Sequence, residues 1–166
     1  MRTPVKFLAL DFETADYGRD SACALGLVRV ENGAISRRKH LLIRPPRRNF
    51  HFTYIHGIYW DDVKGQPTFG ESWPEIAEMM TGVDFLVAHN ASFDRGVLYE
   101  CCRKAGLPVP ELEFRCTMKL ARQIWRIYPT NLPAVCAHFN IPLTHHDAAS
   151  DTEACAKIMI EALKHV

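Results

Sequence analysis

The chain has 166 residues, enough for one domain with a sizeable core, and its 20 basic and 19 acidic residues leave a formal net charge of +1. This balance excludes a global electrostatic attraction to nucleic acid or membrane, so a polyanionic partner would have to be held by a local patch or through metal ions. No stretch resembles a membrane span or a signal segment, so we expect a single domain over residues 1–166 in the cytoplasm, with no membrane partner. The six cysteines include no Cys-x-x-Cys pair, and we expect them to be reduced thiols.

The first predicted element is a buried strand over residues 5–14, an apolar run that ends in two carboxylates. Asp11 and Glu13 are two positions apart, so they share one face of a strand while Phe12 turns to the other face. Two carboxylates this close repel each other unless a cation lies between them, and oxygen ligands suit Mg²⁺ or Mn²⁺. An isolated Asp-x-Glu is also what a strand running out into a polar loop contains, so this motif needs support from the rest of the chain.

Residues 22–30 and 35–43 are predicted to form a hairpin around Asn32 and Gly33, because Asn-Gly favours the positive φ angles of a tight turn. The segment that follows, up to about Gly70, is predicted to be irregular, and it mixes basic with aromatic side chains. Its rings either grip single-stranded nucleic acid or close a small satellite core beneath a long loop. In the same way, Arg47 and Arg48 either clamp a phosphate or lie in a solvated loop.

The second half of the chain alternates helices and strands. We expect a helix over residues 71–82, a strand over 83–88, and a helix with Ser92 as its N-cap and Asp94 in its first turn. A last strand over residues 112–116 and helices over 117–125, 132–139 and 148–163 complete the pattern. This order predicts an α/β fold with a mixed sheet that is flanked by helices on both faces.

Four acids follow strand ends or begin helices in this prediction. Active sites of open α/β sheets form where strand ends and helix starts meet, so these carboxylates are expected to converge. They are Asp11, Glu13, Asp94 and Asp151. His146 precedes the last helix and is placed to lean over the same cleft, whereas His89 is predicted to be a structural histidine that closes a strand-to-helix turn.

Three segments resemble the motifs of the DEDD 3′-to-5′ exonucleases, in the DEDDh branch whose third motif is His-x-Ala-x-x-Asp. They are Asp-Phe-Glu-Thr at residues 11–14, His-Asn-Ala-Ser-Phe-Asp at residues 89–94, and His-Asp-Ala-Ala-Ser-Asp at residues 146–151. Ile-His-Gly-Ile at residues 55–58 is similar to an element that these enzymes carry in the same interval. The resemblance runs from residue 8 to about residue 163, and the pattern is similar to that of the proofreading epsilon subunit of bacterial DNA polymerase III and its stand-alone kin.

The resemblance implies a ribonuclease H-like fold with a mixed five-stranded sheet, and hydrolysis assisted by two divalent cations, Mg²⁺ or Mn²⁺. Asp11, Glu13 and Asp151 would hold one cation, Asp11 would bridge to the second, and Asp94 would support that second cation. His146 would be the general base. The implied reaction removes nucleoside 5′-monophosphates from the 3′ end of single-stranded DNA.

The resemblance also implies contacts with the terminal nucleotide from Phe12, Thr14, His56, Asn90 and Phe93. Three questions stay open on the sequence. The enzyme could act on RNA or short oligonucleotides instead of DNA, since the same site accepts either sugar unless something contacts the 2′-hydroxyl. A catalytically silent nucleic-acid-binding module could retain the same fold, and His145 could replace His146 as the base. A polymerase partner is unproven, because no tethering extension is visible after the last predicted helix.

Overall fold

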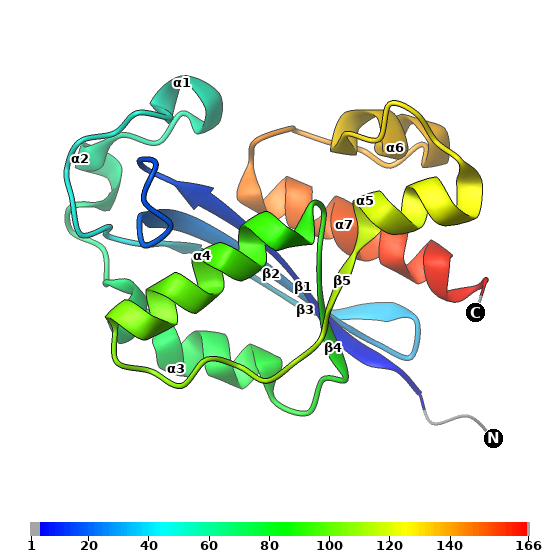
Figure 1. The fold of residues 1–166 in the computed structure, drawn as a ribbon, viewed down its shortest axis with the longest axis horizontal. Helices are drawn as coiled ribbons and strands as arrows, with labels where there is room; N and C mark the ends of the chain where they lie inside the picture. Colours follow the sequence, from blue (N-terminus) through cyan, green and yellow to red (C-terminus); the bar gives the residue numbers. More distant parts are fainter. Residues whose placement is uncertain (1–3, 166) are drawn as a thin grey trace.

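The computed structural model describes residues 4–165, which form a five-stranded sheet in the order β3-β2-β1-β4-β5 (Figure 1). The strands are β1 (Lys6–Thr14), β2 (Ala22–Glu31), β3 (Ala34–Leu42), β4 (Phe85–Ala88) and β5 (Phe114–Cys116). The β1-β2 and β2-β3 pairs are antiparallel, and the β1-β4 and β4-β5 pairs are parallel. The predicted mixed five-stranded sheet is therefore confirmed.

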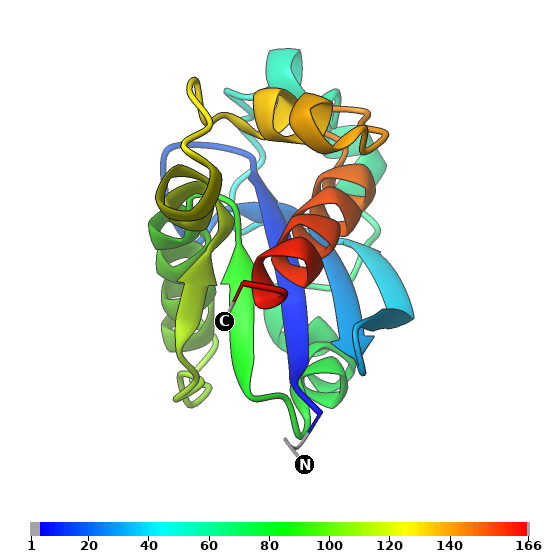
Figure 2. The ribbon, with the colours of Figure 1, turned by 90° about the vertical axis from the view of Figure 1, so that its right-hand side faces the viewer.

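The alternation of side chains along β1 divides the core between the two faces of the sheet. Phe7 and Ala9 pack in one cluster with residues of α7, whereas Leu8, Leu10 and Phe12 pack in another with residues of α3 and α4. Figures 1 and 2 show the same division, with α7 on one face and α3 and α4 on the other. These helices are α3 (Phe69–Met80), α4 (Ala91–Lys104) and α7 (Ala148–Leu163). Because Asp11 and Glu13 continue the Phe7 face, they leave the sheet on the side of α7.

The predicted hairpin is present, with φ angles of 55° at Asn32 and 75° at Gly33. The segment after it is more regular than predicted, because it contains the short helices α1 (Thr53–His56) and α2 (Trp60–Val63). Helix α3 begins at Phe69, two residues before the predicted start. The reason is a capping box, in which the Thr68 and Glu71 side chains accept hydrogen bonds from each other's backbone N–H groups.

The later elements agree with the prediction over residues 132–139 (α6, Leu132–Phe139) and 148–163 (α7). The predicted helix over 117–125 is α5 (Thr117–Leu120), which continues as a π-helical turn. The prediction that Ser92 caps α4 is wrong. The helix begins at Ala91 after Asn90, whose φ angle of 67° lets the chain turn sharply out of β4, and Asp94 still lies in its first turn. None of the helices in the described part of the chain has the length and apolar character needed to cross a bilayer.

The outer strand β3 carries consecutive basic side chains that pair with acids on the helices. The pairs are Arg37 with Glu78, Arg38 with Glu153, and Lys39 with Glu75. They connect the edge of the sheet to α3 on one face and to α7 on the other. The basic charges of this strand are therefore already paired within the protein.

Helix α7 lies against β2 at Gly26, where a side chain would have no room. A Cβ atom on Gly26 would overlap the carbonyl oxygen of Ala148 and the hydroxyl of Thr152, and the backbone carbonyl cannot rotate away as a side chain could. We expect Gly26→Ala to push the first turn of α7 off the sheet and to lower the free energy of unfolding by about 1–3 kcal/mol, the usual cost of overpacking. Thermal denaturation measures this as a fall of about 2–4 °C per kcal/mol. Gly65→Ala is the control, because its Cβ would meet nothing within 4 Å; equal melting temperatures for both variants would contradict the packing argument.

Candidate active site

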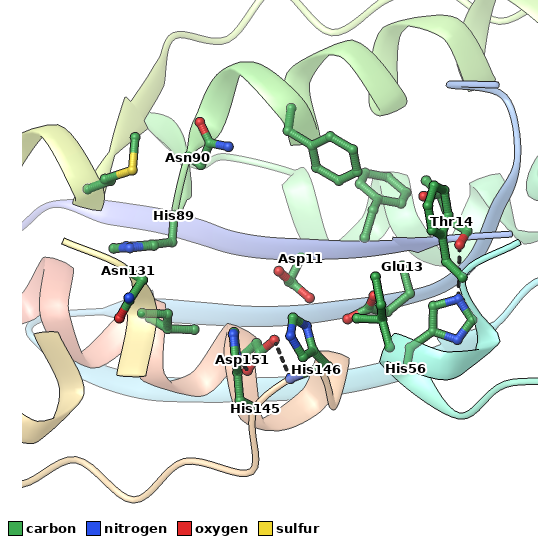
Figure 3. Close-up of a pocket in the computed structure, with 16 residues that line it drawn as sticks. Asp11, Glu13, Thr14, His56, His89, Asn90, Asn131, His145, His146 and Asp151 are labelled. Atoms are coloured by element: carbon green, nitrogen blue, oxygen red, sulfur yellow. Dashed lines mark hydrogen bonds and ion pairs between the residues drawn. The ribbon is translucent and has the colours of Figure 1, made fainter. Parts of the chain in front are cut away.

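The acids converge on a cavity of about 480 Å³ at the end of the sheet where β1 and β4 finish and α4 and α7 begin (Figure 3). Nine of the ten site residues predicted from the sequence line this cavity, and within residues 4–165 Asp94 is the one that does not. The nine are Asp11, Phe12, Glu13, Thr14, His56, Asn90, Phe93, His146 and Asp151. The fold thus brings together residues that are up to 140 positions apart in the chain, from residue 11 to residue 151.

Three carboxylates form a compact group in this cavity. One oxygen each from Asp11, Glu13 and Asp151 lies within 4.8 Å of the others. The Oδ2 atom of Asp11 is buried and has no hydrogen-bond partner within residues 4–165. A buried carboxylate oxygen without a partner is costly, and a bound cation removes that cost. The donor set, all oxygen and all anionic, fits a divalent cation such as Mg²⁺ or Mn²⁺.

Burial raises the pKa values of all four acids. Burial, followed by repulsion from Asp94, Glu13 and Asp151, raises the pKa of Asp11 well above its usual range. Burial and then repulsion from Asp151 raise the pKa of Glu13 to about 8, and burial raises that of Asp94 to about 8. Burial also raises the pKa of Asp151, although His145 opposes the shift. Without a cation Glu13 and Asp94 therefore favour their neutral forms near neutral pH.

Asp94 is held differently from the other three acids. Its side chain is buried, and Oδ1 accepts a hydrogen bond of 2.9 Å from the backbone N–H of Phe12. This bond ties the first turn of α4 to the end of β1. Asp94 thus fixes the strand that carries Asp11 and Glu13, and its charge contributes to the raised pKa of Asp11.

The two neighbouring histidines have different roles in the structure. The Nδ1 atom of His145 lies 3.3 Å from Oδ1 of Asp151, whereas His146 contacts the other oxygen of Asp151 through its backbone N–H, at 3.1 Å. The two rings are stacked, with centroids 3.7 Å apart. Within residues 4–165 the ring nitrogens of His146 have no hydrogen-bond partner, and Figure 3 shows both rings beside Asp151. The His146 imidazole is therefore free to accept a proton from a bound molecule.

His56 closes the opposite end of the cavity by joining α1 to β1. Its Nδ1 accepts a hydrogen bond from the Ile58 N–H at 3.0 Å, so the neutral ring carries its proton on Nε2 and donates it to the Thr14 carbonyl at 2.9 Å. Burial lowers the pKa of His56, which favours this neutral form. Both ring nitrogens are occupied, so His56 presents its ring to the cavity rather than a polar atom.

His89 is a structural histidine, as the sequence predicts. One ring nitrogen contacts the Thr117 hydroxyl and the other contacts the Thr130 carbonyl, both at 2.8 Å. His89 therefore connects the end of β4 to α5 and to the loop that enters α6. Because the ring also lines the cavity, it forms part of the wall without having a free polar atom.

The structure shows what Arg47 contacts. Its guanidinium group pairs with both Asp16 and Asp20, and the shorter side-chain contact to Asp16 is 2.8 Å. These bonds hold the loop after β1 against the segment before α1. These ion pairs favour a structural role for Arg47.

Sequence reasoning missed five residues that also line the cavity, namely Phe52, Ile55, Met118, Asn131 and Leu132. Phe52 and Ile55 belong to the aromatic-rich segment that the sequence left open between binding nucleic acid and closing a satellite core. Asn131 could have been found, since an asparagine directly before a predicted helix is a typical N-cap. Met118 and Leu132 carry no such signal, because apolar residues at helical spacing look the same whether they face a core or a cavity.

Comparisons with known proteins agree with this geometry. Residues 8–159 match the sequence profile of the exonuclease (RNase T) family. The chain is 32% identical over 166 residues to the PolC-type DNA polymerase III of Bacillus cereus, and 32% identical over 170 residues to that of Bacillus subtilis. The matches cover 96% and 95% of this chain but only 11% of each polymerase, so the chain spans about a tenth of the length of these relatives.

Solved structures are similar over nearly the whole chain. Exonuclease X in complex with 5′ overhanging duplex DNA matches with a TM-score of 0.78 and 28% identity, covering 96% of this chain and 92% of that one. The nuclease domain of 3′hExo, a DEDDh family member bound to rAMP, matches with a TM-score of 0.81, covering 98% and 93%; at 16% identity it supports the fold alone. Sequence profile, fold and the three acid motifs agree. The chain therefore belongs to the exonuclease (RNase T) family, and it resembles a segment of PolC-type DNA polymerase III.

Proposed function

We propose that the protein is a metal-dependent exonuclease that removes nucleoside 5′-monophosphates from the 3′ end of single-stranded DNA. The observation that carries this proposal is the group of three acids around the unpartnered oxygen of Asp11, in the cavity at the end of the sheet. Anionic oxygens at this spacing, with raised pKa values, are suited to binding divalent cations.

Two cations, Mg²⁺ or Mn²⁺, would supply stabilisation of the attacking and leaving oxygens when bound. Asp11, Glu13 and Asp151 would hold the first, and Asp11 would bridge to the second. Asp94 would support the second through its remaining oxygen, since Oδ1 is committed to Phe12. The protein contributes fixed charge and geometry rather than a covalent nucleophile.

His146 is the proposed general base. Its ring lines the cavity, and its backbone N–H is hydrogen-bonded to Asp151, which holds the loop close to the acid group. Burial and the neighbouring His145 lower the pKa of His146, so the ring is neutral and able to take up a proton near neutral pH. His145 would instead orient Asp151 through its 3.3 Å contact.

The end of the cavity that contains Thr14 and His56 is the proposed site of the terminal nucleotide. The backbone around Phe12 and the Thr14 side chain would contact the sugar, with the His56 ring packed beside it. Phe93, which is 42% exposed, would pack on the base, and Asn90 would donate a hydrogen bond from the turn before α4. With Thr14 and His56 in the wall at this end, the pocket would receive a chain end, which is what exonuclease action requires.

DNA is the proposed substrate because the similar exonuclease X, at 28% identity, is bound to DNA. The test is a time course with matched 5′-labelled single-stranded DNA and RNA oligonucleotides in Mg²⁺, Mn²⁺ or EDTA. We expect the labelled strand to shorten stepwise from its 3′ end when Mg²⁺ or Mn²⁺ is present and to stay intact in EDTA. We expect the DNA strand to shorten faster than the RNA strand. Faster cleavage of RNA would reassign the substrate to RNA, and binding of either strand without cleavage would indicate a silent module.

The two histidines make a matched pair of variants. His146→Ala is expected to lower kcat by about 10²–10⁴-fold, the usual contribution of a positioned acid or base, with metal affinity unchanged. His145→Ala is expected to weaken metal binding instead, because Asp151 loses the contact that orients it. Isothermal titration with Mn²⁺ and single-turnover kinetics separate these effects. An equal loss of kcat from His145→Ala alone would transfer the role of base to that residue.

A further inference from the structure

The cavity extends to both sides of the acid group, and only one side is used by the proposed terminal nucleotide. Figure 3 shows Asp11 and Asp151 in the middle, Thr14 and His56 at one end, and His89 and Asn131 at the other. A strand whose last nucleotide occupies the Thr14 end, with its scissile phosphate at the acids, must continue away from that end. The part of the cavity near Asn131 therefore lies on the side where the strand leaves.

Asn131 has an unused hydrogen-bond donor at this end, in addition to Asn90, which is already assigned to the terminal nucleotide. Its Oδ1 accepts the N–H of Ala134 at 3.0 Å and so caps α6, while its Nδ2 group has no acceptor within residues 4–165. His89 cannot serve in its place, because both of its ring nitrogens are engaged. The neighbouring side chains Met118 and Leu132 are apolar.

The position of Asn131 is fixed from two directions. Its side chain is held by the cap on α6, and the preceding residue, Thr130, is held through its carbonyl by His89 and through its hydroxyl by Arg122. The side chain is exposed to solvent and faces the cavity. A polar donor that is fixed in this way loses little conformational freedom when it binds a ligand.

We propose that the Asn131 amide donates a hydrogen bond to a backbone phosphate of the nucleotides upstream of the scissile bond. This inference rests on the proposed function, and it adds a substrate contact on the opposite side of the acids from the terminal nucleotide. A donor of this kind reads no base, so it serves strands of any sequence. His89 is the positioning residue that holds it, through Thr130.

The test uses Asn131→Asp, which keeps an oxygen to cap α6 but replaces the donor by a second anionic oxygen. Asparagine and aspartate are equivalent as N-caps, so the variant is expected to melt at the wild-type temperature. Two substrates separate the two ends of the cavity. The p-nitrophenyl ester of thymidine 5′-monophosphate has no phosphate upstream of the scissile bond, whereas a ten-residue oligothymidylate has several.

We expect KM for the oligothymidylate to rise about tenfold or more, the loss typical of a hydrogen bond to a charged group, with kcat/KM for the nitrophenyl ester unchanged. Asn140→Asp is the control, since it adds the same charge at the other end of α6 and is expected to change neither value. An unchanged KM for the oligothymidylate, or an equal loss on both substrates, would overturn the proposal.

The two proposals can fail separately. If the wild-type protein cleaves neither substrate in Mg²⁺ or Mn²⁺, the exonuclease proposal fails, and the affinity of the 5′-labelled oligothymidylate is measured by fluorescence anisotropy instead. A tenfold weaker Kd for Asn131→Asp than for Asn140→Asp would still support the phosphate contact. Equal affinities for the two variants would refute it.

Discussion

Replacing Asp11 with asparagine is expected to abolish turnover while making the metal-free protein more stable. The amide keeps the size of the side chain but removes the charge that would bridge two cations. Metal ions contribute several kcal/mol to such reactions, and each 1.36 kcal/mol is a factor of ten, so the rate should fall by about 10³-fold or more. Stability should rise because a buried, unpartnered carboxylate beside three other acids becomes neutral.

Opposite changes in activity and stability are what distinguish a metal ligand from a residue that maintains the fold. Single-turnover cleavage of labelled DNA and thermal denaturation in EDTA measure the two quantities. Asp61→Asn is the control, because the Asp61 side chain is 83% exposed on α2 and should affect neither. Near-normal cleavage by Asp11→Asn would show that the metal assignment is wrong.

The second large effect is a loss of stability of the metal-free protein as the pH rises from about 7 to about 8. The pKa of Glu13 and that of Asp94 are each about 8 in the folded protein, against about 4 in an unfolded chain. Between these values the folded state binds more protons than the unfolded state, so the free energy of unfolding falls as the pH rises. The contribution of these acids is complete below about pH 4 and is lost as the pH passes about 8.

Three histidines set the lower limit of the pH range in which the free energy of unfolding falls. His56, His89 and His146 all have lowered pKa values, so below their ordinary pKa of about 6.5 they act in the opposite direction. Above about pH 7 the acids dominate. We expect the melting temperature in EDTA to fall by several degrees between about pH 7 and pH 8, at about 2–4 °C per kcal/mol.

Millimolar Mg²⁺ should raise the melting temperature at pH 8 and flatten its dependence on pH, because the cation binds the ionised acids of the folded state. Differential scanning calorimetry at closely spaced pH values, with EDTA or with Mg²⁺, measures both effects. Glu13→Gln should reduce the slope in EDTA, since it removes one of the titrating groups. A melting temperature that is the same at both pH values in EDTA, and the same with Mg²⁺, would contradict the electrostatic account of the site.

The sequence was sufficient to predict most of the fold because its periodic elements are long and clearly bounded. The last helix, over residues 148–163, and the hairpin around Asn32 and Gly33 agree with the structure. The first turn of α4 does not, since the start depends on the αL conformation of Asn90 and not on a capping side chain. The helices α1 and α2 were missed because four-residue helices leave too short a periodic signal.

The candidate site also has features that the sequence could predict and features that it could not. The acids could be predicted because their types, spacing and order are tied to the chemistry of metal binding. The roles of single atoms could not be predicted, because they depend on the tertiary packing. Three examples are contacts that only the folded chain creates. Asp94 accepts a hydrogen bond from the Phe12 amide, and His145 contacts Asp151 while the His146 ring is free. Asn131 faces the cavity.

The ion pairs along β3 have a consequence for the behaviour of the protein at high concentration. An outer strand with open backbone N–H and C=O groups is a template onto which a strand from another molecule can add. On β3, Arg37, Arg38 and Lys39 are held by acids from α3 and α7, so an incoming strand would meet a row of fixed charges. Such charges protect the edge of the sheet from the addition of a strand from another molecule.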